Sequence, residues 1–171
     1  MGIYSRDELE KIINQYGDAV YRMAFIHVKN HDVADDIYQD VWMKLIRQKA
    51  YIEPKEHLKA WLLRTTINCC KDYWKSSWIQ RISWKEKEVN EEPYEEVNKE
   101  EQSIGYITEC VQRLPEKYRA ILHLYYYEDY SQKEIAKLLH MNENTVACRL
   151  VRGRERLGKM LEEEEKKGYE Y

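Results

Sequence analysis

Apolar residues recur every three or four positions along most of the chain, and this spacing predicts α-helices. Ser5 and Glu8 match a capping box, so we expect a helix to begin between them. We predict a second helix from Asp32, which can cap it, and a third from about Leu58 to beyond Trp74. No segment shows a convincing strand pattern. The fold class that we predict is therefore all-α.

One segment interrupts the helical pattern and divides the chain. Residues 85–103 contain Pro93 and repeated Glu but no apolar period, which indicates a flexible linker. Helical spacing resumes at Ile104, and Pro115 is expected to end that helix and to open the next as its first residue. We therefore expect two small helical domains, residues 1–84 and residues 104–171, joined by the linker.

The strongest local pattern is a helix-turn-helix over residues 132–151. Ser131 is placed to cap its first helix and Asn142 its second. His140 stands at the turn, where a positive φ is often needed and Gly is usual. A simple helical hairpin with a solvated basic face is the alternative.

The second helix of this motif has two different faces. Val146, Leu150 and Leu157 form a stripe that we expect to be buried. The opposite side carries Asn144, Thr145, Cys148, Arg149, Arg152, Arg156 and Lys159. Amide, hydroxyl and guanidinium groups suit base edges, and the cations farther along suit phosphates. The pattern predicts a DNA-reading helix.

The charge distribution supports contact with a polyanion. The 171 residues carry 28 basic and 31 acidic side chains, a net charge of −3. Residues 41–84 nevertheless have nine basic against three acidic side chains, and residues 131–160 have seven against three. The linker between them has three basic and eight acidic ones. Two basic regions on either side of an acidic segment suggest two contacts with one nucleic acid, although charge runs can also be solvated faces.

The third predicted helix also has a basic face. Its basic side carries Arg64, Asn68, Lys71 and Lys75, flanked by Ile67, Trp74 and Trp78. The other side carries Leu58, Leu62, Thr65, Cys69 and Tyr73. Cations next to aromatic rings suit a DNA single strand, because they bind its backbone and stack on its bases. Simple packing of the Trp rings is the alternative. The helix over residues 32–47 differs, since its mixed stripe of Asp36, Gln39, Asp40, Met43 and Arg47 suits a protein partner better than DNA.

Other functional classes find little support in the composition. Apolar runs are too short for a membrane span or a secretory signal. The four Cys residues have no C-x-x-C spacing, so we expect neither a disulfide scaffold nor a zinc ribbon, and a reducing cytoplasmic location is the simplest interpretation. An enzyme using His27 and His31 with Asp32 or Asp36 as metal ligands is a remote alternative, because the sequence 30–32 looks like a break between helices. We expect no metal, no cofactor and no catalytic residue.

Three groups of motifs resemble bacterial sigma factors. Residues 35–42 (DDIYQDVW) are similar to region 2.2 of that family. Residues 61–64 (WLLR), together with Asn68 and the pair at 72–73, resemble regions 2.3 and 2.4. The resemblance to region 4 lies in LPEKYR at 114–119, the capped helix at 131–139 and NTV at 144–146. A short linker in place of a middle domain resembles the extracytoplasmic-function (ECF) group.

The resemblance implies a function without catalysis. A protein of this family binds core RNA polymerase through the clamp helices of the largest subunit and through the flap, and it directs initiation at promoters. The resemblance implies that core polymerase is bound by Asp36, Gln39, Asp40, Met43 and Arg47. It implies that the −10 element is opened by Tyr51, Arg64, Asn68, Lys71, Trp74 and Lys75. It implies that the −35 element is recognised by Asn144, Thr145, Cys148, Arg149, Arg152 and Arg156. It also implies an anti-sigma factor as a partner. A dimeric helix-turn-helix regulator that acts without stable polymerase association is the alternative.

Overall fold

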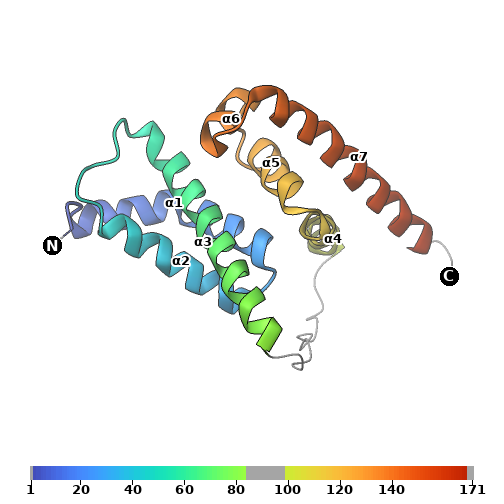
Figure 1. Ribbon diagram of the computed structural model, residues 1–171, viewed down its shortest axis with the longest axis horizontal. Helices are drawn as coiled ribbons and strands as arrows, with labels where there is room; N and C mark the ends of the chain where they lie inside the picture. The colour runs from blue at the N-terminus through green and yellow to red at the C-terminus, as the bar shows by residue number, and fades with distance from the viewer. Residues whose placement is uncertain (1, 84–98, 169–171) are drawn as a thin grey trace.

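The computed structural model describes residues 2–83 and 99–168, and side chains over 2–76 and 106–167. All elements in these ranges are helices (Figure 1), as the apolar spacing predicted. They are α1 (Arg6–Val28), α2 (His31–Ile46), α3 (Glu56–Ser83), α4 (Lys99–Arg113), α5 (Glu116–Tyr126), α6 (Gln132–Leu139) and α7 (Glu143–Gly168). Figure 1 shows α1, α2 and α3 as one group and α4 to α7 as the other, so the two helical domains are present.

Helix starts follow the capping signals closely. Ser5 forms the predicted capping box with Glu8, and Ser131 forms a second one with Glu134. The prediction for α2 was wrong by two residues, since Asn30 rather than Asp32 is its N-cap. The Asn30 side chain accepts a hydrogen bond from the Val33 amide at 3.1 Å, which leaves Asp32 in the first turn.

The helices around the linker also differ slightly from the prediction. Helix α4 begins at Lys99, earlier than the expected start at Ile104, so the last part of the predicted linker is helical. Pro115 is the N-cap of α5 and not its first residue. The rest of the predicted linker, residues 84–98, lies outside the described residues.

A first hydrophobic cluster lies within α1, α2 and α3. Its fully buried members include Val20, Ala34, Val41, Leu45 and Leu62. The predicted core face of α3 is confirmed, because Leu58, Leu62 and Cys69 all belong to this cluster, with Tyr73 partly buried against it. We call this group of residues the N-terminal cluster. It fixes the orientation of α2 and α3 and hence of their exposed faces.

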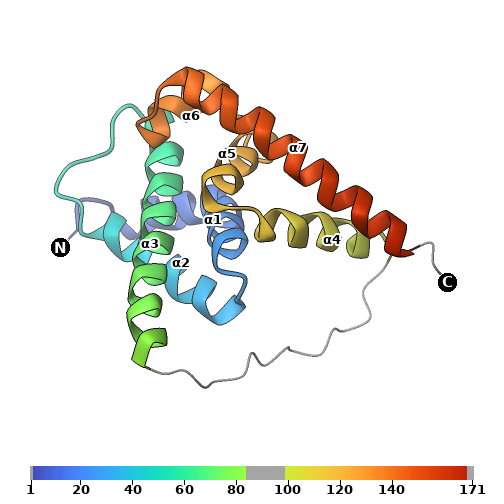
Figure 2. The ribbon, with the colours of Figure 1, turned by 45° about the vertical axis from the view of Figure 1, so that its right-hand side comes forward.

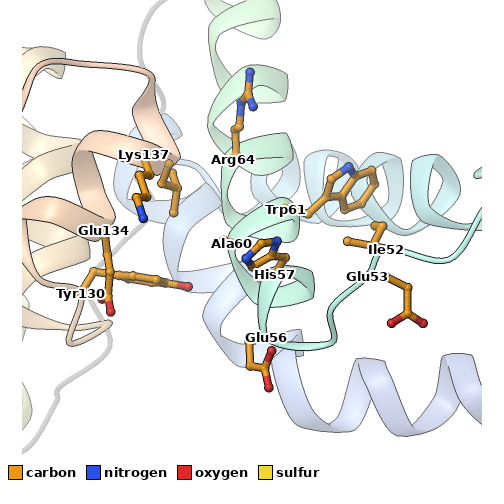
Figure 3. A pocket seen from close by; sticks show the side chains of 11 residues that line it. Ile52, Glu53, Glu56, His57, Ala60, Trp61, Arg64, Tyr130, Glu134 and Lys137 are labelled. Atoms are coloured by element: carbon orange, nitrogen blue, oxygen red, sulfur yellow. The ribbon is translucent and has the colours of Figure 1, made fainter.

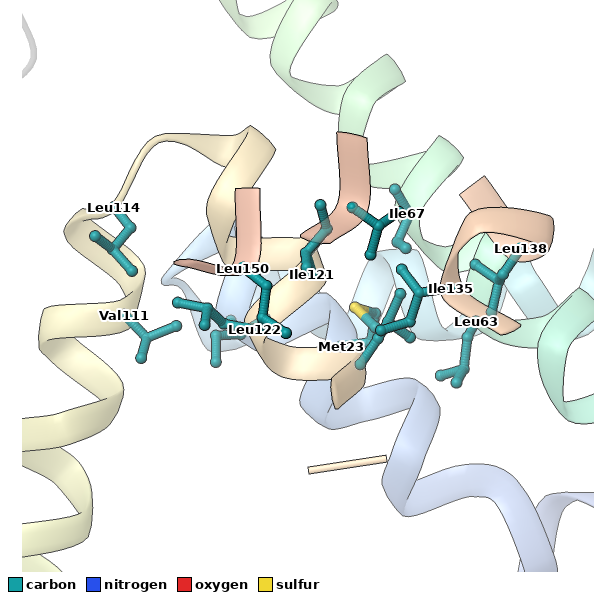
Figure 4. Packing of buried hydrophobic residues seen from close by; sticks show 14 of the residues in the cluster. Met23, Leu63, Ile67, Val111, Leu114, Ile121, Leu122, Ile135, Leu138 and Leu150 are labelled. Atoms are coloured by element: carbon teal, nitrogen blue, oxygen red, sulfur yellow. The ribbon is translucent and has the colours of Figure 1, made fainter. Parts of the chain in front are cut away.

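A second cluster joins the two groups of helices (Figure 4). Met23 of α1 and Leu63 and Ile67 of α3 pack with Ile135 and Leu138 of α6. Figure 2 shows α6 beside one end of α3 and α5 beside α1. The sequence predicted only a covalent connection between the domains, whereas the structure gives them a shared core, which we call the inter-domain cluster.

Candidate nucleic-acid interface

Helices α6 and α7 form the predicted helix-turn-helix. His140 lies in the left-handed region with φ 53°, as its place at the turn predicted. Asn142 accepts a hydrogen bond from the Asn144 amide at 2.8 Å and so caps α7. Val146 and Leu150 are buried against the rest of the domain, which turns the opposite face of α7 to solvent.

The exposed face of α7 carries most of the side chains proposed for −35 recognition. Asn144, Cys148 and Arg152 are exposed, at intervals of four residues. Two arginines have protein contacts of their own. Arg149 is half-buried and donates to Met141 Sδ at 3.5 Å, and the Arg156 guanidinium lies 5.1 Å from the Tyr118 ring centre.

Thr145 is half-buried on this face, and Val151 is an exposed apolar residue that the sequence analysis missed. Val151 is 52% exposed and lies one position before Arg152. An apolar side chain on a DNA-reading helix can contact the methyl group of thymine. The periodicity gave no signal for Val151, because an apolar residue is normally counted toward the core.

The basic face of α3 is exposed only in part. Arg64, Asn68, Lys71 and Lys75 are exposed, as predicted. Trp74 is half-buried, and its Nε1 donates to the backbone oxygen of His27 at 3.1 Å. Packing therefore accounts for part of the role of this ring. The side chain of Trp78, which was expected beside it, lies outside the described residues.

The loop before α3 presents Tyr51, which is 46% exposed. The Tyr51 hydroxyl donates to the Ile3 carbonyl at 3.1 Å, and its ring meets the Tyr4 ring edge-on with centres 5.0 Å apart. These contacts fix the loop against the start of the chain.

The mixed stripe of α2 lies on a single exposed face. Asp36, Gln39, Asp40, Met43 and Arg47 are all exposed, and Met43 is 44% exposed. Ile37, Val41 and Leu45 on the other side are buried in the N-terminal cluster. The stripe is therefore rigidly held and open to a partner.

Family comparisons agree with this arrangement of two helical units. The model of Sigma-70 region 2 matches residues 12–79, and the model of Sigma-70, region 4 matches residues 104–157. The two matches occur in family order on either side of the predicted linker. The chain belongs to the bacterial RNA polymerase sigma factors, in their ECF group. From here on, α1 to α3 are called region 2 and α4 to α7 region 4.

Several curated sigma factors are similar over nearly the whole chain. RNA polymerase sigma factor SigV of Bacillus subtilis is 29% identical, with 82% of each chain covered. SigZ of the same species is 27% identical over 90% of this chain and 87% of its own length. The ECF sigma factor SigM of B. subtilis is 27% identical over 87% of this chain and 92% of its own.

Two solved structures share the fold. The sigma factor RpoE of Bartonella quintana, in complex with the anti-sigma factor NepR, superposes with a TM-score of 0.74 at 20% identity. That match covers 90% of this chain and 96% of the other. CnrH, in complex with the cytosolic domain of CnrY, gives a TM-score of 0.69 at 18% identity, with 92% and 90% covered.

Membership of the family gives the chain its general function, which is promoter-specific initiation of transcription through RNA polymerase. The alternative of a dimeric regulator acting without stable polymerase association is not favoured. Sigma factors are DNA-binding initiation factors, and the solved RpoE of B. quintana is bound to an anti-sigma factor.

A carboxylate at the boundary between region 2 and region 4 is the most strongly perturbed acid of the described residues. Glu128 Oε1 lies 3.3 Å from Arg22 and 3.4 Å from His123 Nε2, and its Oε2 lies 3.1 Å from Lys59 Nζ. Burial acts to raise the pKa of Glu128, but His123 and Lys59 outweigh it and lower the pKa to about 2. Glu128 is therefore a buried anion that joins the two regions.

A pocket of about 590 Å³ also lies between the two regions (Figure 3). Region 2 supplies His57, Trp61 and Arg64, and region 4 supplies Glu134 and Lys137. The helical pattern indicated Arg64 as a binding residue but gave no signal for Glu128 and its partners. Their contacts join residues far apart in the chain, and a helical period carries no signal for such pairs.

The remote metal hypothesis has no geometric support in the described residues, where no group of three or more His, Cys, Asp or Glu side chains could hold an ion. His27 is buried. His31 is exposed, its Nδ1 shares a hydrogen bond of 2.7 Å with the Tyr21 hydroxyl, and its ring stacks on Phe25. Over residues 2–83 and 99–168, no helix has the length and apolar character needed to span a membrane.

Proposed function

We propose that this sigma factor directs core RNA polymerase to its promoters through three separate surfaces. The observation that carries the proposal is the arrangement of α7. Its Val146 and Leu150 side is buried, so that Asn144, Cys148 and Arg152 form a continuous exposed stripe on the second helix of a helix-turn-helix. Such a stripe can enter the major groove, and each good bidentate base contact contributes roughly 1–3 kcal/mol of discrimination.

The α7 surface reads the −35 element in this proposal. The amide of Asn144 and the hydroxyl of Thr145 lie near the helix start, where base edges are reached. Arg149, Arg152 and Arg156 follow along the helix and bind base edges or phosphates. Cys148 and Val151 supply the less polar contacts between them. The half-buried Arg149 is the more constrained arginine, because it already contacts Met141.

The α3 surface opens and holds the −10 element. Arg64, Asn68, Lys71 and Lys75 are exposed on one side of a long helix and can follow a DNA backbone. Tyr51 and Trp74 offer aromatic rings at its edges. Stacking of an unpaired base on such a ring contributes about 1–3 kcal/mol, so the polymerase must supply the remaining energy for melting.

The α2 surface binds the clamp helices of the polymerase largest subunit through Asp36, Gln39, Asp40, Met43 and Arg47. Its exposed acidic residues and its 44% exposed Met43 suit a mixed protein interface. Region 4 contacts the polymerase flap. The sigma factor acts in the cytoplasm, holds no cofactor, has no chemistry of its own, and is restrained by an anti-sigma factor.

Run-off transcription tests the proposed function. Core polymerase from the native host is mixed with the pure protein and fragmented genomic DNA of that host, and the transcripts are sequenced. We expect a small set of start sites that core polymerase alone does not use, with shared elements near −35 and −10. Transcripts identical to those of core alone would contradict the proposal.

A further inference from the structure

The loop between α2 and α3, residues 47–55, carries Tyr51 of the proposed −10 surface. Its start is held locally, since the Arg47 amide donates a hydrogen bond to the Met43 carbonyl at 3.1 Å. Among the described residues, the backbone over 49–53 makes only one hydrogen bond, and that bond goes to a side chain from outside the loop. The middle of the loop therefore depends on another part of the chain for its position.

Residues 2–4, which precede α1, supply the contacts that the loop lacks. The Ile52 amide donates a hydrogen bond to the Tyr4 hydroxyl at 3.0 Å. The Tyr51 hydroxyl donates to the Ile3 carbonyl at 3.1 Å, and the rings of Tyr4 and Tyr51 meet edge-on with centres 5.0 Å apart. Tyr4 is only 9% exposed and belongs to the N-terminal cluster, so its hydroxyl is a fixed point for the loop.

Gly2 allows residues 2–4 to lie this close to the loop. A Cβ on Gly2 would stand 2.5 Å from the carbonyl oxygen of Ile46, the last residue of α2. A backbone oxygen cannot rotate away as the end of a side chain can. Any larger residue at this position must therefore push residues 2–4 away from the loop.

Packing beneath the loop is incomplete. The loop and α1 leave a hollow of about 410 Å³ between them, which Tyr4, Tyr51 and Ile52 line together with Glu8 and Lys11 of α1. The Ile52 side chain packs only partly against the N-terminal cluster. Dispersion contacts are lost where a surface faces empty space, so the hydrogen bonds to residues 2–4 decide where the middle of the loop lies.

We propose that Tyr4 is a positioning residue for promoter opening. Its hydroxyl, together with the Ile3 carbonyl, holds the loop 47–55 in the conformation in which the exposed Tyr51 ring meets an unpaired base of the −10 strand. Tyr4 does not touch DNA and acts through Tyr51. The inference rests on the −10 role proposed for Tyr51, and it gives residues 2–4 a function in promoter opening.

The contact acts by ordering the loop before DNA arrives. A loop that moves freely must be ordered on binding, and the competent fraction of its conformations sets the apparent affinity. If loss of the Tyr4 hydroxyl lowers that fraction to about one-fifth, promoter opening falls about fivefold. The Tyr4 ring belongs to the N-terminal cluster whereas its hydroxyl reaches the loop, so removing the oxygen alone separates the two roles.

Amide hydrogen exchange of the full chain, followed by NMR, tests the contact itself. Tyr4→Phe keeps the buried ring and removes the acceptor of the Ile52 amide. Tyr16→Phe is the matched control, because Tyr16 packs against the same cluster and its hydroxyl forms no hydrogen bond with the part of the chain that the structure describes. We expect the Ile52 amide to exchange about fivefold faster in Tyr4→Phe and as in wild type in the control. Equal rates in all three proteins would overturn the proposal.

Permanganate footprinting of the holoenzyme tests the function, on a promoter found by the run-off experiment. Tyr4→Phe should open this promoter about fivefold more slowly, while its affinities for core polymerase and for the −35 duplex stay as in wild type. Tyr16→Phe should open it at the wild-type rate. Opening by Tyr4→Phe at the wild-type rate would overturn the proposal.

A double-mutant cycle shows whether Tyr4 acts through Tyr51. In a Tyr51→Ala background, Tyr4→Phe should cause no further loss of opening. Two losses that multiply would assign Tyr4 to general stability and overturn the positioning role. If Tyr51→Ala alone opens the promoter as wild type does, the −10 role of Tyr51 is wrong and the inference falls with it. Faster exchange of the Ile52 amide in Tyr4→Phe then distinguishes that failure from a contact that does not form.

Gly2→Ala covers the case in which Tyr4→Phe disturbs the N-terminal cluster. This variant keeps every ring and hydroxyl but forces residues 2–4 away from Ile46. With circular dichroism unchanged, it should speed exchange of the Ile52 amide and slow promoter opening, as Tyr4→Phe does. Faster exchange with opening at the wild-type rate would overturn the proposal.

Discussion

The indole N–H of Trp74 donates a hydrogen bond to the backbone oxygen of His27 at 3.1 Å, and so ties α3 to the last turn of α1. A carbonyl in the last turn of a helix has no partner within the helix, so the indole satisfies an acceptor that would otherwise need water. The ring of Trp74 is therefore fixed in position at the edge of the proposed −10 surface.

This relationship separates two roles of Trp74. Trp74→Phe keeps an aromatic face but loses the N–H, so it should lower the free energy of unfolding by about 0.5–1.5 kcal/mol and largely retain promoter opening. Trp74→Ala combined with Lys71→Ala should reduce open-complex formation while core binding is retained. Permanganate footprinting measures this opening. A premelted bubble template should rescue much of the loss, and equal defects on duplex and bubble would assign Trp74 to packing alone.

The α2 stripe predicts a charge-dependent contact with core polymerase. Reversing both Asp36 and Asp40 to Lys should weaken core binding, because like charges placed together at an interface can cost several kcal/mol. Asp18→Lys is the control, since Asp18 is exposed on α1 and is not part of the stripe. Titration of fluorescent sigma factor with core polymerase gives the affinities. Equal affinities for the double variant and wild type would remove this surface from the proposal.

Two arginines of α7 offer a matched comparison. Arg152 is exposed on the proposed −35 face, whereas Arg154 lies 5.5 Å from the ring centres of Tyr125 and Tyr126. Arg152→Ala should cost about 1–3 kcal/mol in promoter binding, and it should relax specificity at one base pair if Arg152 reads a base edge. Arg154→Ala should leave promoter choice unchanged. Transcription from a promoter with single-base changes distinguishes the variants.

Burial of His27 predicts that stability depends on pH. Burial, followed by the charges of Arg119 and His123 on α5 and Lys71 on α3, lowers the pKa of His27 to about 3. In the unfolded chain His27 binds a proton near pH 6.5, whereas in the folded protein it stays neutral until the pH falls to about 3. The stability that depends on a neutral His27 is therefore fully present above pH 6.5 and is lost as the pH falls toward 3.

Between pH 7.5 and pH 5, this histidine should remove about 2 kcal/mol from the free energy of unfolding. His27→Gln cannot take up the proton, so its stability should fall less over the same range. Urea denaturation at the two pH values measures both slopes. Parallel slopes for the two proteins would show that His27 is not the responsible group.

Two glycines of α7 differ in their surroundings. A Cβ on Gly153 would lie 3.2 Å from Tyr118 Cβ and 3.3 Å from Leu122 Cδ1, whereas a Cβ on Gly158 would meet nothing within 4 Å. Gly158→Ala should therefore stabilise the protein by up to about 1 kcal/mol through helix propensity. Gly153→Ala should gain less or lose stability, because α5 must move away. Thermal unfolding compares the two.

Features that depend on neighbouring residues were predictable from the sequence. Ser131, Asn142 and the positive φ of His140 were all predicted correctly, because caps and turns are decided within a few residues. The exposed faces of α2, α3 and α7 also followed from the helical period. The start of α2 was misplaced because Asn30 and Asp32 are both good caps, and only the chain geometry selects between them.

The contact between the two regions was not predictable in this way. Ile67 was expected beside the DNA-binding face of α3, whereas it is buried with Ile135 of region 4. Glu128 gave no signal at all, since its partners Arg22 and Lys59 are distant in sequence. A period reports which side of a helix is apolar, but it does not report which other helix covers that side.

The two hydrophobic clusters also differ in when they can form during synthesis. Every member of the N-terminal cluster lies between Ile3 and Tyr73, so all of its side chains leave the ribosome before those of α4. The inter-domain cluster needs Met23 and Leu63 as well as Ile135. A nascent chain therefore presents an apolar patch on α1 and α3 until region 4 emerges, and this patch is a natural site for chaperones to act on the growing polypeptide.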